Sequence, residues 1–143
     1  MKRLFFVLVM VAGIFSAYAQ SPVRESFFIL FPPNSANLRG VSAEQAVANM
    51  EVFTEVARYL IDNPEARLLI EGHANALSGT AREERQSLLP LSRQRAEAAA
   101  NFIAANFGIN PRRFIISGAG GRYPYSRTDR YLNRRVSFIV ITP

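Results

Sequence analysis

The stretch LLIEGHAN at residues 68–75, followed after a polar loop by LSRQRA at residues 91–96, decides how this chain folds. The first stretch begins as an apolar run of strand length and ends in small and polar residues. The second opens a long segment with small apolar residues at helical spacing. Loops between rigid elements carry binding groups, and helix N-termini attract anions. We therefore expect a ligand site where these two stretches meet.

Length and composition predict one exported domain. The chain has 143 residues, no cysteine and a formal net charge of +6. This length suits a single domain, and the lack of cysteine excludes disulfides, thiolate zinc sites and cysteine nucleophiles. Residues 1–19 combine a basic start, an apolar run and a small-residue ending, which predicts a cleaved signal peptide. An uncleaved anchor is the alternative, but the apolar run is short for a membrane span. We expect residues 20–143 to form one domain without an integral membrane segment.

Positive charge is concentrated in the C-terminal third of the chain. From Gly108 onward there are seven arginines and one acid, Asp129. Such a basic region indicates an anionic partner. Nucleic acid is a poor candidate for an exported protein, so we expect cell-wall carboxylates or an anionic lipid surface.

Periodicity and turn signals predict four strands and two main helices. The strands are expected at residues 26–31, 67–71, 114–116 and 135–142, and both faces of the last strand should be largely covered. A first helix should follow the capping box of Ser42 and Gln45 and end near Ile61. Its expected core face comprises Ala46, Met50, Phe53, Ala57 and Leu60.

The second helix is predicted at residues 93–107. Ser92 is its expected N-cap and Gly108 its C-cap, while Pro90 should limit any earlier helix. The resulting order is strand, helix, strand, helix, strand, strand. This order predicts an α/β (α+β) two-layer sandwich, with a mixed four-stranded sheet and both helices on one face. Right-handed crossovers should give parallel strand pairs, and the last strand is expected to run antiparallel.

Three separated motifs resemble the OmpA-like peptidoglycan-binding domain, the module of OmpA C-terminal domains, Pal lipoproteins and MotB stator proteins. The usual signature reads roughly I-x-G-H-T-D, then L-S-x-x-R-A, then N-R-R-V. The counterparts here are IEGHAN at 70–75, LSRQRA at 91–96 and NRRV at 133–136. The match covers about residues 26–141. It implies the β-α-β-α-β-β fold, a periplasmic location and a non-catalytic role in binding the cell wall.

The resemblance also implies a site. In typical members the aspartate of the first motif and the arginine of the second hold the diaminopimelate unit of the peptidoglycan stem peptide. Arg95 matches that arginine and is expected near the first turn of its helix, where the helix dipole also favours an anion. An exposed helix arginine paired with Glu97 or with an acid of the loop is the alternative. Asn37 aligns with a polar position that touches the ligand backbone. The supporting motif residues are Gly72, His73, Leu91, Ser92, Asn133, Arg134 and Arg135, and one of the two arginines should brace the strand and loop.

Two departures from the family pattern predict an altered pocket. Asn75 stands where the aspartate belongs, so a charge-assisted bond to an ammonium is lost and diaminopimelate should bind more weakly. The loop from Asn75 to Arg95 is about five residues longer than usual, and Leu88 replaces a common asparagine. The domain either recognises a wall with another third residue, such as lysine or ornithine, or has become an envelope scaffold that binds a protein partner.

No pattern in the chain predicts an enzyme. His73 is the single histidine, and neither Ser78 nor Ser92 lies in a nucleophile-elbow pattern. One histidine with scattered acids does not form a metal site. We therefore expect no catalytic residue, no metal and no cofactor.

Overall fold

The computed structural model describes residues 27–143. The predicted signal peptide, residues 1–19, and the start of the first predicted strand at Ser26 lie outside the described residues.

Four strands form one mixed sheet in the order β1-β4-β2-β3. Strand β4 runs antiparallel to both β1 and β2, whereas β2 and β3 are parallel. The predicted order of elements along the chain and the mixed sheet are confirmed. The expected parallel pairing holds only for β2 with β3, because β4 inserts between β1 and β2. The strands span Phe28–Leu30 (β1), Arg67–Gly72 (β2), Phe114–Gly118 (β3) and Arg135–Ile141 (β4).

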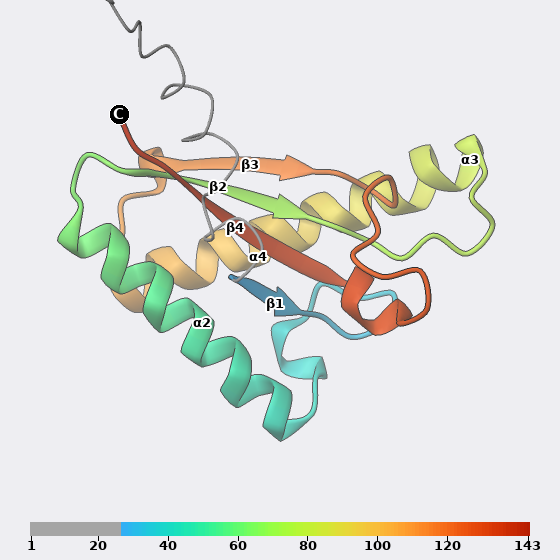
Figure 1. Cartoon of the computed structure of the whole chain (residues 1–143), viewed down its shortest axis with the longest axis horizontal. Coiled ribbons are helices and arrows are strands. Elements are labelled where there is room, and N and C mark those ends of the chain that lie inside the picture. Colours follow the sequence, from blue (N-terminus) through green and yellow to red (C-terminus); the bar gives the residue numbers. More distant parts are fainter. Residues whose placement is uncertain (1–26) are drawn as a thin grey trace, which may run out of the picture.

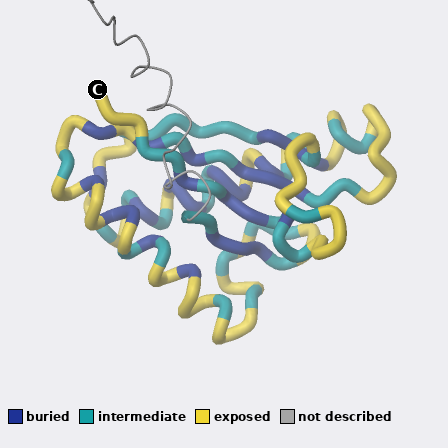
Figure 2. The backbone as a smooth tube through the Cα atoms, viewed as in Figure 1, coloured by how far each residue is buried: buried dark blue, intermediate teal, exposed yellow. Residues whose placement is uncertain are grey.

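Two long helices, α2 (Ala43–Asp62) and α4 (Leu89–Phe107), cover one face of this sheet (Figure 1). Alternate residues of the strands point toward the helices, and Leu68, Ile70 and Phe138 are fully buried there. Figure 2 shows buried residues along the central strands and at intervals along the helices. On the opposite sheet face Ser137 and Ile139 are partly buried, so β4 is largely covered on both faces except at its end, where Ile141 is exposed. Short helical turns complete the fold at Leu38–Gly40 (η1), Ala81–Glu83 (α3), Pro111–Arg113 (η3) and Arg130–Asn133 (η4).

The N-terminal half of α2 differs from its predicted core face. Ser42 caps the helix as predicted, since its hydroxyl accepts from the Gln45 N–H at 3.1 Å. Ala46 and Met50 are exposed, however, and Asn49 is buried instead. The Asn49 amide bonds both backbone groups of Leu30, accepting from its N–H at 3.0 Å and donating to its carbonyl at 2.9 Å. The side chain thus satisfies the free edge of β1, where no further strand of residues 27–143 pairs.

Helix α4 begins earlier than predicted. It is preceded by one π-helical turn, η2 (Glu84–Leu88), in which the Leu89 N–H bonds the Glu84 carbonyl. Pro90 has no N–H to donate, and the widened turn lets the helix pass through it. Ser92 is therefore inside the helix and is not an N-cap. Its hydroxyl donates to the Leu89 carbonyl and accepts from the Gly120 N–H, both at 2.9 Å.

Two glycines fix the ends of the elements around α4. Gly108 adopts a left-handed conformation with φ of 66° and caps the helix as predicted. Gly72 lies against the helix backbone, because a Cβ placed there would be 1.8 Å from the Ser92 carbonyl oxygen. The small face of α4, with Ala96 and Ala99 fully buried, allows this close packing on the sheet.

Candidate functional site

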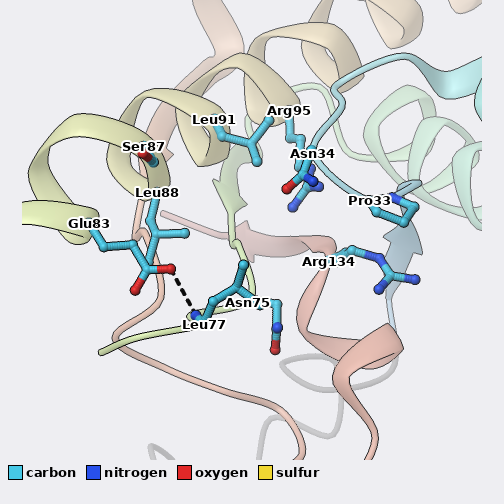
Figure 3. Close-up of a pocket in the computed structure, with 10 residues that line it drawn as sticks. All are labelled: Pro33, Asn34, Asn75, Leu77, Glu83, Ser87, Leu88, Leu91, Arg95 and Arg134. Carbon is cyan, nitrogen blue, oxygen red and sulfur yellow. Dashed lines mark hydrogen bonds between the residues drawn. The ribbon is translucent and has the colours of Figure 1, made fainter. Parts of the chain in front are cut away.

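A cavity of about 270 Å³ opens where β2 ends and η2 leads into α4 (Figure 3). It therefore lies where residues 68–75 meet residues 91–96, as the sequence predicted. The walls come from the loop after β1, the loop after β2, the η2–α4 segment and the residue before β4. The residues that line it are Pro33, Asn34, Asn75, Leu77, Glu83, Ser87, Leu88, Leu91, Arg95 and Arg134.

Arg95 forms the floor of the pocket as a buried cation. Its Nε and Nη2 donate to the carbonyl oxygens of Ser35 and Pro32, at 2.9 and 3.0 Å. Its Nη1 donates to the His73 carbonyl at 2.9 Å, which ties the loop after β1 to the end of β2. The side chain is fully buried. Arg95 is in the second turn of α4, where the helix dipole no longer adds to the attraction of an anion. Glu97 does not pair with Arg95, because it pairs with Arg93 at 3.0 Å.

A second arginine, Arg134, also lines the pocket and makes one side of it positively charged. Arg134 donates from Nε to the Phe31 carbonyl at 3.2 Å and lies 4.8 Å from the ring centroid of Tyr131. Burial and the nearby Arg134 charge lower the pKa of Arg95 to about 10, so it stays protonated at neutral pH. Within residues 27–143, neither arginine has a carboxylate within 4.0 Å. Two such unpaired cations favour an anionic ligand group.

Asn75 lines the pocket and is oriented by Asn133. The Asn133 Nδ2 donates to Asn75 Oδ1 at 3.1 Å and to the Ser126 carbonyl at 2.8 Å. Asn133 Oδ1 accepts from the Ser126 N–H at 2.9 Å. Asn133 is buried, so its role is to hold the loop before η4 and to aim Asn75.

His73 and Arg135 lie behind the pocket, on the sheet face away from the helices. Arg135 donates from Nη2 to the Tyr123 carbonyl at 3.2 Å and stacks 5.4 Å from the Tyr125 ring centroid. These contacts brace the start of β4 against the loop before η4. His73 Nε2 is 3.2 Å from a Glu71 oxygen. Burial, with Arg135 as the second cause, nevertheless lowers the pKa of His73 to about 3. The residue is 2% exposed, so the desolvation outweighs the contact, and His73 is neutral at neutral pH.

The structure brings four of the predicted site residues into one pocket: Asn75, Leu91, Arg95 and Arg134. Gly72 and Ser92 hold α4 against the sheet and the glycine turn. Asn37 is exposed, and its side chain accepts from the Arg39 N–H to cap η1. It does not line the pocket. Asn34, three residues earlier and with φ of 50°, lines it instead.

The long loop after β2 supplies a wall that sequence reasoning did not assign. Leu77, Glu83, Ser87 and Leu88 all come from this loop and its helical turns. A signal for Glu83 was present in the sequence. Thr80 and Glu83 have capping-box spacing, and Thr80 Oγ1 accepts from the Glu83 N–H at 3.2 Å. Among the described residues no group of three acids or histidines could hold a metal ion.

These features define a class of protein, an α/β sandwich domain with a small pocket at the C-terminal end of a central strand. The sequence profile of the OmpA family matches residues 30–135, and the chain belongs to this family. OmpA-like domains generally bind peptidoglycan and are binding or structural modules, not enzymes. Comparison with curated proteins gave no match.

Solved structures share the fold. The peptidoglycan-associated lipoprotein of Burkholderia pseudomallei superposes with a TM-score of 0.62 at 20% identity, over 80% of this chain and 89% of that one. The C-terminal domain of Helicobacter pylori MotB gives 0.58 at 19% identity, over 80% and 85%. The cell wall anchor of the T6SS from Pseudomonas aeruginosa gives 0.54 at 25% identity, over 79% and 74%. No helix within residues 27–143 is long and apolar enough to span a membrane.

Proposed function

We propose that this domain is a non-catalytic module that binds the stem peptide of peptidoglycan in the pocket of Asn75 and Arg95. The observation that carries the proposal is the meeting of these two residues and Arg134 in one cavity, where no acid of the described chain pairs with either arginine. Family membership and the wall-associated relatives support it.

The positive side of the pocket suits a carboxylate of the stem peptide. Arg95 uses three of its five N–H groups on backbone carbonyls, so its contribution is a fixed positive charge more than a free bidentate fork. Arg134 uses only Nε in hydrogen bonds with the described part of the chain. A carboxylate beside these groups would compensate two cations that residues 27–143 leave unpaired. Asn37 remains a prediction for the part of the ligand outside the pocket.

Asn75 changes what the pocket recognises. Its Oδ1 can accept from an ammonium, but without the charge assistance of an aspartate. We therefore expect weaker binding of diaminopimelate at this position than in relatives that carry the acid. The loop of residues 76–88 also forms one wall. We therefore expect a pocket of another shape than in relatives with a shorter loop, one that could select lysine or ornithine as the third residue of the stem peptide.

The alternative is an envelope scaffold that binds a protein partner in place of the wall. The loop between β3 and η4 favours this possibility, because Arg122, Arg127, Tyr123 and Tyr125 are all exposed on it. Arginine and tyrosine are enriched at protein interfaces. In either case we place the protein in the periplasm, on the basis of the predicted signal peptide and the envelope relatives.

Co-sedimentation of the purified protein with diaminopimelate-, lysine- and ornithine-type peptidoglycan tests the proposal. Arg95→Ala removes three hydrogen bonds and threatens the fold, so a better variant is Ser87→Trp, which fills the cavity from an exposed helical position. Gln86→Trp, on the neighbouring residue that does not line the pocket, is the matched control. We expect Ser87→Trp to lose wall binding and Gln86→Trp to keep it. A folded wild-type protein that binds none of the three walls would sink the proposal and favour the scaffold.

A further inference from the structure

We propose that Glu83 is the acidic group of the pocket and receives the ligand ammonium that the family assigns to an aspartate at the position of Asn75. This inference rests on the proposed function. Glu83 is the single acid among the ten residues that line the cavity. Figure 3 shows it and Arg134 on opposite sides of the pocket, with Asn75 between them. A ligand that bears both an ammonium and a carboxylate matches this separation of charge.

The Glu83 carboxylate is held in place before any ligand arrives. Its Oε1 accepts from the Leu77 N–H at 2.8 Å. Its Oε2 accepts from the N–H groups of Ser78 and Gly79, at 2.8 and 2.9 Å, and from the Ser78 hydroxyl at 2.6 Å. Four donors from one tight loop fix the carboxylate, so an incoming cation need not order it.

The same contacts leave one position for a cation. A carboxylate oxygen offers about two acceptor sites. Oε2 has three donors and is saturated, whereas Oε1 has one and can accept again, from the ligand. The hydrogen bond from the Ser78 hydroxyl, followed by those from the loop N–H groups, lowers the pKa of Glu83 to about 2. Glu83 is therefore negatively charged throughout the neutral pH range.

The loop that carries Glu83 explains how Asn75 can be neutral. Thr80 caps the turn of α3, and this turn directs Glu83 back over Leu77 and Ser78. The acid thus reaches the pocket from the long loop instead of from the strand end.

Charge relocation tests this assignment. Wild type, Glu83→Gln, and the double variant Asn75→Asp/Glu83→Gln are co-sedimented with diaminopimelate-type peptidoglycan, either untreated or with its free amines acetylated. Acetylation removes the ammonium and leaves the carboxylates. Glu51→Gln, at an exposed position on α2, is the control for loss of one negative charge. Circular dichroism verifies that each variant is folded.

We expect wild type and Glu51→Gln to bind the untreated wall about tenfold more tightly than the acetylated wall, a typical effect of one charged hydrogen bond. Glu83→Gln should bind both equally, and the double variant should regain the preference. Failure of the double variant to regain it would show that Glu83 acts only by shaping the loop, which overturns the inference. Equal binding of both walls by wild type would also overturn it but leave the proposed function standing. The same comparison is run with lysine- and ornithine-type peptidoglycan, and binding to none of the walls would refute the proposed function itself.

Discussion

Replacing Gly72 by alanine tests how closely β2 and α4 must approach. A Cβ on Gly72 would lie 1.8 Å from the Ser92 carbonyl oxygen and 3.3 Å from the Ala96 backbone nitrogen. Real Cβ contacts are essentially never shorter than 3.0 Å, so the helix backbone must move by at least about 1.2 Å. A side chain could rotate away, but the backbone of a packed helix cannot. Overpacking a core costs about 1–3 kcal/mol, and occasionally more. We therefore expect Gly72→Ala to lower the free energy of unfolding by about 3 kcal/mol or more.

Gly108→Ala separates this effect from the conformational freedom of glycine. Gly108 has φ of 66°, and no atom lies within 4 Å of the place that a Cβ would occupy. Its substitution should therefore cost only about 1–2 kcal/mol. Urea unfolding followed by circular dichroism measures both variants. With an m-value of about 1.5 kcal/mol/M, the midpoint should fall by about 2 M in Gly72→Ala. Equal losses in the two variants would refute the argument from close approach.

Three further substitutions or conditions test other parts of the structure. Asn49→Leu leaves the N–H and carbonyl of Leu30 without partners and should cost about 2–4 kcal/mol in urea unfolding; a loss under about 1 kcal/mol would show that water replaces the amide. Burial and Arg135 lower the pKa of His73 from 6.5 to about 3. The unfolded chain therefore takes up a proton that the folded protein does not, so stability falls as the pH drops from about 6.5 toward 3. Between about pH 7.5 and pH 5.0 the loss should be about 2 kcal/mol, and His73→Gln should remove it; an unchanged loss in that variant would assign it to other groups. Asn75→Asp should strengthen binding to diaminopimelate-type peptidoglycan several-fold in co-sedimentation, and no gain would mean that the long loop has rebuilt the site.

Local signals in the sequence are enough for most of the fold. The apolar runs at the four strands and the caps at Ser42 and Gly108 depend on neighbours within a few residues. The motif residues Asn75 and Arg95 are likewise located from the sequence and meet in one pocket. Sequence signals for the start of a helix are less reliable, because they also depend on how the preceding turn is wound. Ser92 and Pro90 indicate a helix start, whereas a π-helical turn carries the helix through both.

The roles of side chains whose partners are distant in the chain were decided by tertiary structure. The sequence determined that Arg95 would lie at the site, but not that its guanidinium would bond carbonyls up to 63 residues away. Asn49 satisfies an edge strand 19 residues earlier. Glu83 enters the pocket only because the loop folds back through Thr80. Hydrophobic periodicity and capping are set by the local backbone, so the sequence reveals them. The partner of a buried polar group depends on which segments packing brings together, and only the folded chain determines that.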